Sequence, residues 1–192
     1  MNRGNIKGWL EVITGPMFSG KTEELLKRIN TLKWAEVNTL VIKPSFDNRF
    51  SESELVSRTG ARLNSQNVSN SKEILKLWNK NYQAVAIDEM NFFDEDFPQV
   101  IEELLKNNVN VLVSGLDLDF LRKPFGIAPH IIAIADEVCK LKAVCVKCKA
   151  PAGFSFRKIK SQDLNVLGDA EYEARCRICH MEGEKAKLNN IN

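Results

Sequence analysis

Short apolar runs alternate with amphipathic segments along the first two thirds of the chain. Predominantly apolar runs, typical of buried strands, occupy residues 9–14, 39–42, 84–87 and 109–113. The helices predicted between them carry apolar residues at helical spacing over residues 25–32, 71–79 and 97–105. Continuous apolar strands in alternation with helices predict an α/β fold, with a parallel sheet flanked by helices. The polar segment 44–66 is expected to be an exposed excursion.

From Cys145 onward the pattern changes to short, basic stretches that contain cysteines and no long apolar helix. We therefore predict two domains, an α/β domain over residues 1–142 and a small domain over residues 143–192. Residues 182–192 are expected to be a frayed, flexible tail of the second domain.

The composition is that of an ordinary globular protein. The 192 residues are 44% hydrophobic and 27% charged, which excludes collagen-like and fully disordered chains. No run approaches the ~18 apolar residues of a membrane helix. The start MNRGNIKGW lacks the apolar region of a secretory signal. These features predict a cytoplasmic protein.

Positive charge is concentrated near the C-terminus. Residues 140–192 contain 11 Lys and Arg against 6 Asp and Glu, whereas residues 1–139 contain 16 against 19. This mild, local excess argues against a protein that holds nucleic acid by bulk charge, and it leaves room for a small site that binds an anion. Loop arginines are candidate clamps for a polyphosphate, and composition alone does not choose among Arg49, Arg58, Arg122 and Arg157.

The first predicted strand leads directly into a glycine-rich loop, GPMFSGKT. This loop fits the phosphate-binding pattern G-x-x-x-x-G-K-[ST] with Gly15, Pro16, Met17, Phe18, Ser19, Gly20, Lys21 and Thr22. In such loops, main-chain N–H groups and the positive end of the next helix bind phosphates. Lys21 is expected to reach the terminal phosphates, and Thr22 to hold Mg²⁺. The alternative is a glycine turn with a surface lysine; the strand before the loop and the helix after it favour the phosphate site.

A pair of acidic residues follows the strand 84–87. Asp88 and Glu89 come at the carboxyl end of that strand, where ligands bind in open α/β sheets. Asp88 is placed to assist Mg²⁺, directly or through water. Glu89 is placed to take a proton from the group that attacks the γ-phosphate. An acidic pair alone is more often a solvated strand end, but the glycine loop favours the catalytic interpretation.

Two Cys-x-x-Cys pairs enclose 27 residues near the C-terminus. They supply four soft ligands, enough for a closed structural Zn²⁺ site, and the enclosed segment is expected to form a hairpin or loop. The ligands would be Cys145, Cys148, Cys176 and Cys179. His180 adjoins Cys179 and could replace it as a ligand. Cys139 is interpreted as a small, buried hydrophobic residue.

The order of these motifs resembles that of a known family. GPMFSGKT, DNRF, DEMNFF, GLDLDFLRKPFG and the cysteine pairs follow one another between residues 8 and 180. In this order they resemble the zinc-containing thymidine kinases of animal cytosol and many bacteria. The resemblance implies a P-loop NTPase-like sheet and a small C-terminal domain that binds zinc and forms a lasso-like loop. It also implies transfer of the γ-phosphate of ATP to the 5′-hydroxyl of thymidine or deoxyuridine, with Mg²⁺, in a homotetramer under feedback by thymidine triphosphate.

The resemblance also implies roles for individual residues. Glu89 would be the base that deprotonates the 5′-hydroxyl, and Asp88 would act at the metal and phosphates. The nucleotide would be contacted by the glycine loop and by Met90, Asn91, Arg49 and Arg157. The thymine pocket would be lined by Met17, Phe120, Ser155, Val166, Leu167, Gly168 and Tyr172. Two positions depart from the family pattern, because Asn91 stands where Gln is often found and Arg58 where His is common.

Without the resemblance, the residues indicate an ATP-using phosphoryl-transfer enzyme with a structural zinc lobe, and they do not name the acceptor. A zinc-bearing P-loop ATPase that acts on nucleic acid is the alternative in the same fold, because Glu89 could activate water. A non-catalytic zinc-ribbon binding module is the alternative from another class, but it has no use for the loop 20–22 or for Glu89. We expect neither a nucleic-acid nor a membrane partner.

Overall fold

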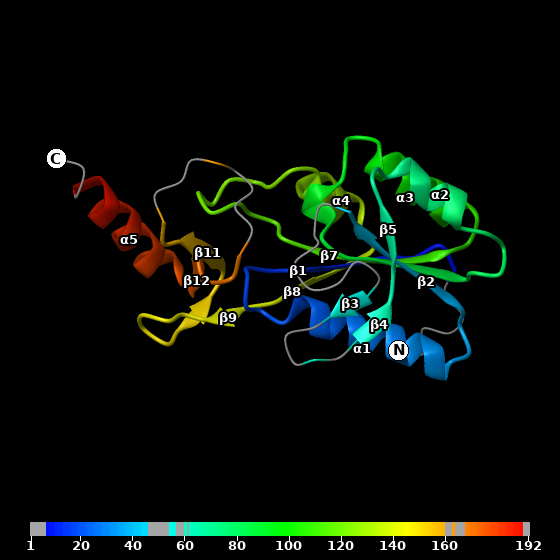
Figure 1. Cartoon of the computed structure of the whole chain (residues 1–192), viewed down its shortest axis with the longest axis horizontal. Helices are drawn as coiled ribbons and strands as arrows, with labels where there is room; N and C mark the ends of the chain where they lie inside the picture. The colour runs from blue at the N-terminus through cyan, green and yellow to red at the C-terminus, as the bar shows by residue number, and fades with distance from the viewer. Residues whose placement is uncertain are drawn as a thin grey trace.

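Six strands of mostly buried residues pair side by side in a parallel sheet, which is followed by a small C-terminal lobe (Figure 1). The computed structural model describes residues 7–45, 54–56, 60, 62–159, 163 and 168–189. The strand order is β5-β2-β6-β7-β1-β8. These strands are β1 (Leu10–Thr14), β2 (Thr39–Pro44), β5 (Gln66–Val68), β6 (Ala84–Ile87), β7 (Asn110–Gly115) and β8 (Glu137–Lys140). The predicted parallel sheet is confirmed.

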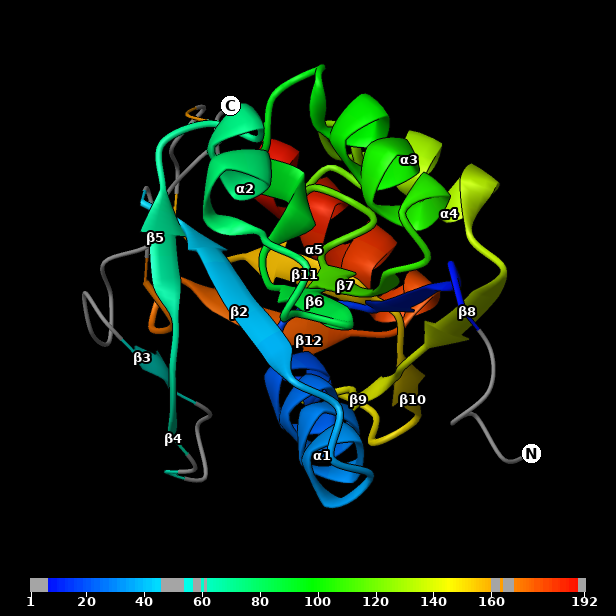
Figure 2. The ribbon, with the colours of Figure 1, turned by 90° about the vertical axis from the view of Figure 1, so that its right-hand side faces the viewer.

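Helices cover both faces of this sheet (Figure 2). α1 (Lys21–Trp34) lies on one face, and the other face carries α2 (Lys72–Leu77), α3 (Phe97–Lys106) and α4 (Ala128–Ile134). Side chains alternate between faces along a strand, so Leu10 and Val12 of β1 join the core with α3 and α4, whereas Ile13 packs against α1. Burial on both faces explains why these strands read as continuous apolar runs. Among the described residues, no helix is long and apolar enough to cross a bilayer.

Several short elements were missed by the sequence analysis. β5 and β8 extend the sheet at its edges, and α4 precedes β8. Within the expected excursion, β3 (Glu54–Val56) and β4 (Arg62–Asn64) form a separate antiparallel pair. These elements are short and several are polar, so they leave no clear periodicity in the sequence.

In the described part of the C-terminal lobe there are two small antiparallel sheets and one helix. β9 (Ala143–Val144) pairs with β10 (Pro151–Ala152), and β11 (Phe154–Arg157) pairs with β12 (Tyr172–Arg175). The helix α5 (Arg177–Asn189) packs on β11 and β12. We call residues 143–189 the cysteine lobe.

The helix α5 corrects the expectation of a frayed tail from residue 182, because the chain is helical through Asn189. Gly183 lets α5 approach β11 closely, since a Cβ there would come within 2.7 Å of the Phe156 ring and would also strike the Arg175 guanidinium. The Lys187 ammonium lies 4.1 Å from the centre of the Phe156 ring. Contacts with distant strands therefore stabilise this helix, and sequence periodicity does not reveal them.

Phe97 provides a test of the core on the α3 face. Its side chain is fully buried and stacks on Phe93, with ring centroids 4.4 Å apart. Phe97→Ala should lower the free energy of unfolding by about 3–5 kcal/mol, because apolar burial is lost and a cavity remains. Urea denaturation followed by circular dichroism measures this loss, with Glu102→Ala on the exposed side of the same helix as control. A loss for Phe97→Ala no larger than the control's would contradict this packing.

Candidate active site

Three parallel strands bring the predicted nucleotide-binding residues to one edge of the sheet. Thr14 of β1 pairs with Gly115 of β7, and Val113 of β7 pairs with Ile87 of β6. The segments that follow β1 and β6 therefore emerge at the same carboxyl edge, where α/β sheets bind ligands. These segments are the glycine loop, residues 15–22, and the acidic pair, residues 88 and 89.

The glycine loop has a backbone suited to binding phosphate. Gly15, Phe18 and Gly20 have positive φ angles of 145°, 67° and 80°, and turns of this kind direct successive N–H groups into a concave anion site. A Cβ at Gly15 would come within 2.6 Å of the Leu141 carbonyl oxygen, so only glycine fits there. The Lys21 ammonium donates to the Pro16 carbonyl at 2.9 Å, which keeps the cation at the loop.

Asp88 connects the acidic pair to the glycine loop. Its carboxylate accepts a hydrogen bond from the Thr22 hydroxyl at 3.3 Å and another from the Ser114 hydroxyl at the end of β7. Neighbouring oxygens on one Mg²⁺ lie about 3 Å apart, because Mg–O distances are about 2.1 Å in an octahedron. The spacing of the Thr22 and Asp88 oxygens is therefore compatible with a site that could hold Mg²⁺ between them.

Glu89 has a backbone conformation that is unusual for its residue type. Its φ and ψ angles are 55° and 49°, in the left-handed region that costs a non-glycine residue roughly 1–2 kcal/mol. Its N–H donates to the Asp88 carboxylate at 2.9 Å, and the short helix η2 (Met90–Phe92) follows. Backbone strain of this kind is concentrated at functional sites, so it supports a role for this turn beyond connecting two elements.

The cysteine lobe meets the glycine loop through β11. Because side chains alternate along a strand, Ser155 and Arg157 lie on one face of β11, and Phe154 and Phe156 on the other. The Ser155 hydroxyl accepts a hydrogen bond from the Met17 N–H at 2.9 Å, which joins the lobe to the glycine loop. The opposite face of β11 packs inside the lobe, where both phenylalanine rings contact α5.

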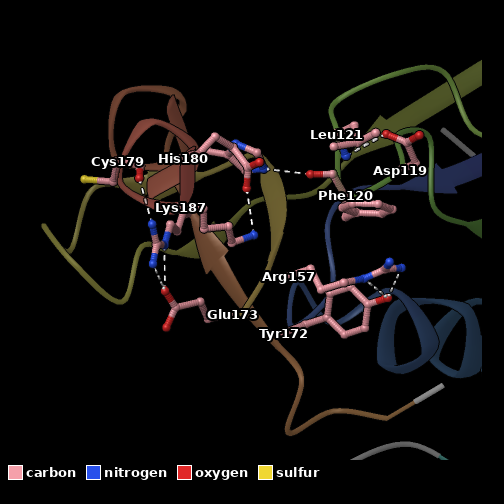
Figure 3. Close-up of polar contacts among 11 residues, drawn as sticks. Asp119, Phe120, Leu121, Arg157, Tyr172, Glu173, Cys179, His180 and Lys187 are labelled. Carbon is pink, nitrogen blue, oxygen red and sulfur yellow. Dashed lines mark hydrogen bonds and ion pairs between the residues drawn. The ribbon is translucent and has the colours of Figure 1, made fainter. Parts of the chain in front are cut away.

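Two aromatic residues and a buried arginine gather at this junction (Figure 3). The Arg157 guanidinium lies 3.6 Å from the centre of the Phe120 ring and donates to the Tyr172 hydroxyl from Nε at 3.0 Å and from a terminal nitrogen at 2.7 Å. Arg157 itself is only 1% exposed. Phe120 comes from the loop after β7, and Tyr172 begins β12. The structure thus brings residues from both parts of the chain into one cluster beside the glycine loop.

The four paired cysteines converge within the lobe. The sulfurs of Cys145, Cys148, Cys176 and Cys179 all lie within 4.8 Å of one another, and none is in a disulfide. Thiolates around one tetrahedral Zn²⁺ lie about 3.8 Å apart, because Zn–S distances are about 2.3 Å. The Sγ atoms of Cys148 and Cys176 are 3.6 Å apart. The cluster could therefore hold one metal ion, and its spacing fits Zn²⁺.

The pKa values of these thiols depend on the short distances between the four cysteines. Burial acts to raise the pKa of Cys145, but hydrogen bonds from the main chain of Cys148, Cys176 and Lys147 outweigh it and lower that pKa to about 6. Hydrogen bonds with the side chains of Cys176 and Cys148 raise the pKa of Cys179 to about 12. Crowded sulfurs cannot all ionise unless a cation lies among them, so a metal that binds here would release protons.

His180 does not take part in this cluster. Its side chain is fully buried, and its Nε2 lies 3.0 Å from the Phe120 carbonyl oxygen. Burial lowers the pKa of His180, which favours the neutral imidazole at neutral pH. The alternative in which His180 replaces Cys179 as a metal ligand is therefore corrected, since Cys179 completes the group of four sulfurs.

Comparisons with known proteins identify the family. The family model for thymidine kinase matches residues 8–180. A thymidine kinase of Mycoplasma mobile is 53% identical over 193 residues, which cover 100% of this chain and 96% of that protein. Thymidine kinases of Metamycoplasma arthritidis and Mesomycoplasma hyopneumoniae are each 51% identical, over 95% and 90% of this chain and 95% of each protein. The chain belongs to the thymidine kinase family.

Some residues that the resemblance to thymidine kinases singled out lie outside the described part of the chain. They are Arg49, Arg58, Val166 and Leu167. Gly168 is described, with a φ of 136°, and it precedes β12. The predicted roles of all these residues stay predictions.

Met90 and Asn91 occupy η2 behind the acidic pair, and both are buried. The side-chain Oδ1 of Asn91 accepts a hydrogen bond from the Leu116 N–H at 2.8 Å, which ties η2 to the loop after β7. A direct contact of either residue with the nucleotide stays a prediction. Cys139 packs against the core on the α1 face, as predicted, but it is half-buried and not fully buried.

Ser114 is a site residue that the sequence analysis did not assign. It contacts Asp88 because β6 and β7 are neighbours in register, with Ile87 beside Val113. A signal was available, since Ser114 and Asp88 both follow apolar strands that a parallel sheet would align. The contact between His180 and Phe120 gave no such signal, because 60 residues separate the two positions.

The cysteine cluster predicts one zinc ion per chain in the reduced protein. Cys148→Ser should remove most of this zinc, because three thiolates and a hydroxyl bind Zn²⁺ less well than four thiolates. Plasma mass spectrometry of the purified protein measures the metal. The matched control is Cys139→Ser, which changes the one cysteine outside the cluster and should keep its zinc. A wild-type protein without zinc, or equal loss in both variants, would contradict the assignment.

Proposed function

We propose that this protein transfers the γ-phosphate of ATP to the 5′-hydroxyl of thymidine, giving thymidine monophosphate, and that deoxyuridine is a second acceptor. Membership of the thymidine kinase family implies phosphorylation of thymidine. The observation that carries the proposal is the position of Asp88, which contacts Thr22 of the glycine loop and adjoins Glu89. A phosphate site and a candidate base thus share one edge of the sheet.

On the nucleotide side, the chain supplies hydrogen-bond donors and positive charge. The N–H groups of the glycine loop and the Lys21 ammonium would bind the β- and γ-phosphates. Thr22 and Asp88 would hold Mg²⁺, which neutralises phosphate charge when bound. Arg157, two positions beyond Ser155 on the same face of β11, is proposed to approach the phosphates as well. Phosphoryl transfer depends chiefly on such positioning and charge neutralisation.

Glu89 is the proposed general base. Its half-buried side chain follows the Asp88 carboxylate in a strained turn at the carboxyl edge of the sheet. It would accept the proton of the 5′-hydroxyl as that oxygen bonds to the γ-phosphorus, while the bond from the γ-phosphorus to the β–γ bridging oxygen breaks and ADP leaves. Asp88 is committed to Thr22 and Ser114, which leaves Glu89 as the acidic residue of the pair for proton transfer.

On the acceptor side, the cluster at the lobe junction is the proposed thymine pocket. The Phe120 ring is a flat apolar surface that carries the Arg157 guanidinium on one face, and Tyr172 and the buried Ser155 place hydroxyl groups beside it. Met17 reaches this junction through its main chain. The segment that contains Val166, Leu167 and Gly168 is proposed to close over the base as a lasso. Because a pyrimidine is planar and apolar on its faces, stacking on an aromatic side chain suits it.

The resemblance also supports proposals about assembly and regulation. We propose a cytoplasmic homotetramer that is inhibited by thymidine triphosphate and has no nucleic-acid or membrane partner. An end product that carries both the base and a triphosphate could occupy the thymine pocket and the glycine loop together, which gives feedback a physical basis.

Removal of the proposed base should abolish transfer and spare nucleotide binding. Glu89→Gln keeps the size of the side chain and loses the proton acceptor, so kcat should fall by ~10² or more. The dissociation constant for ATP, measured by calorimetry, should change by less than about threefold, since the loss concerns the transition state. Glu95→Gln, an exposed change nearby, is the matched control. Full turnover in Glu89→Gln would exclude this role.

A panel of acceptors separates a nucleoside kinase from an ATPase that acts on nucleic acid. With thymidine, ADP and thymidine monophosphate should appear in equal amounts; deoxyuridine should also react. With no acceptor, or with single-stranded DNA in place of a nucleoside, ADP release should stay at background. ATP hydrolysis that is stimulated by DNA and insensitive to thymidine would overturn the proposed function.

A further inference from the structure

His180 connects the metal-binding end of the cysteine lobe with the loop that carries Phe120 (Figure 3). It directly follows Cys179 in α5 and is 0% exposed. Its Nε2 lies 3.0 Å from the Phe120 carbonyl oxygen, across a sequence separation of 60 residues. The proposed phosphoryl-transfer mechanism assigns no role to this buried imidazole.

The chemistry of the contact determines which nitrogen carries the proton. A carbonyl oxygen can only accept, so Nε2 must donate. Nδ1 is enclosed without a hydrogen-bond partner in the described part of the chain. The imidazole is also held from the sides, because Phe154 and Phe156 make edge contacts with it at centroid distances of 5.9 and 5.2 Å. The donor therefore has a fixed position and a fixed direction.

The loop that receives this hydrogen bond is held together by hydrogen bonds of its own. The Asp119 carboxylate accepts from the N–H groups of Leu121 and Lys123, each at 2.8 Å, and the Asp119 N–H donates to the Lys123 carbonyl at 2.9 Å. These bonds fix the shape of the turn around Phe120. The hydrogen bond from His180 instead fixes the position of this turn relative to the cysteine lobe.

The Phe120 ring and the residues around it come from opposite sides of the same junction. Phe120 belongs to the loop after β7, whereas Arg157 and Tyr172 belong to the cysteine lobe. The Arg157 guanidinium lies against the Phe120 ring at 3.6 Å, so the position of the ring relative to the lobe depends on how the turn is held. A shift of the turn would change the packing of the ring on the lobe, and with it the surface that a planar base would meet.

We propose that His180 is a positioning residue for the acceptor, which holds Phe120 at the correct distance from β11 and so sets the affinity for thymidine. This inference rests on the proposed function, because it takes Phe120 as part of the thymine pocket. It predicts an effect on acceptor binding that is separate from nucleotide binding and from metal content.

The test compares two replacements of His180 that differ in their hydrogen-bonding capacity. His180→Phe keeps a flat ring and loses the donor, which leaves the Phe120 carbonyl without this partner. His180→Gln restores an N–H donor at a similar reach. Met181→Ala, an exposed change at the next position of α5, is the matched control. For each protein, calorimetry gives the dissociation constant of thymidine, kinetics give KM for thymidine and for ATP, and mass spectrometry gives zinc content.

His180→Phe should raise the thymidine dissociation constant and KM about fivefold to tenfold, because the turn that carries Phe120 loses a partly buried hydrogen bond that positions it. KM for ATP and the zinc content should match the control. His180→Gln should recover most of the affinity. If His180→Phe does not fold, His180→Asn serves instead, since its shorter amide fills part of the space and does not reach Phe120.

Four results would overturn the inference. The first is an unchanged thymidine affinity in a folded His180→Phe or His180→Asn variant, and the second is an equal loss of thymidine affinity in His180→Gln and His180→Phe. The third is a rise of the KM for ATP together with the KM for thymidine. The fourth is a loss of zinc in the folded variant that accounts for its weaker thymidine binding. A wild-type protein that fails to bind thymidine would overturn the proposed function along with it. Normal binding in the wild type with normal binding in the variants would overturn this inference alone.

Discussion

The parallel register of β6, β7 and β1 is the constraint on which the site depends. In this register Asp88 meets the Ser114 hydroxyl at the end of β7 and the glycine loop after β1. A shift by one residue would send every side chain of a strand to the other face. Val85 and Ile87 pack in one core and Ala86 in the other, so apolar contacts on both faces of the sheet exclude such a shift. The geometry of the acidic pair is thus a consequence of core packing.

The cysteine lobe has no comparable core. Among the described residues, one of its buried clusters is made of the small residues Ala143, Cys145, Ala152 and Ala174, and small side chains gain little free energy from burial. Its larger buried side chains, Phe154 and Phe156, pack around His180 on the other side of β11. Domains of this size commonly depend on a metal or on disulfides. A metal on the four sulfurs would therefore stabilise the strands that carry Ser155 and Tyr172, and it would influence acceptor binding without contacting the acceptor.

The sequence predicted those features whose information is local. The glycine loop, the Cys-x-x-Cys pairs and the acidic pair are each encoded within a few consecutive residues, and apolar runs located β1, β2, β6 and β7 to within two residues. Because β1, β7 and β6 are parallel neighbours, the glycine loop after β1 and Asp88 after β6 come to the same edge of the sheet, and no longer-range sequence signal is needed to predict this. The elements that were missed depend on distant partners: β5 is polar, and α5 is stabilised by Phe156 of β11 across Gly183.

The two faces of β11 explain how one short strand serves both the metal-binding lobe and the candidate site. Phe154 and Phe156 pack on His180 inside the lobe, whereas Ser155 and Arg157 reach Met17, Phe120 and Tyr172 at the junction. The period of two along a strand keeps these sets apart. In a helix, positions 154 and 157 would share a face and mix the two environments. Adjacent residues of β11 contact opposite sides of the strand. A small displacement of Phe154 and Phe156 in the lobe would therefore also displace Ser155 and Arg157 at the candidate site.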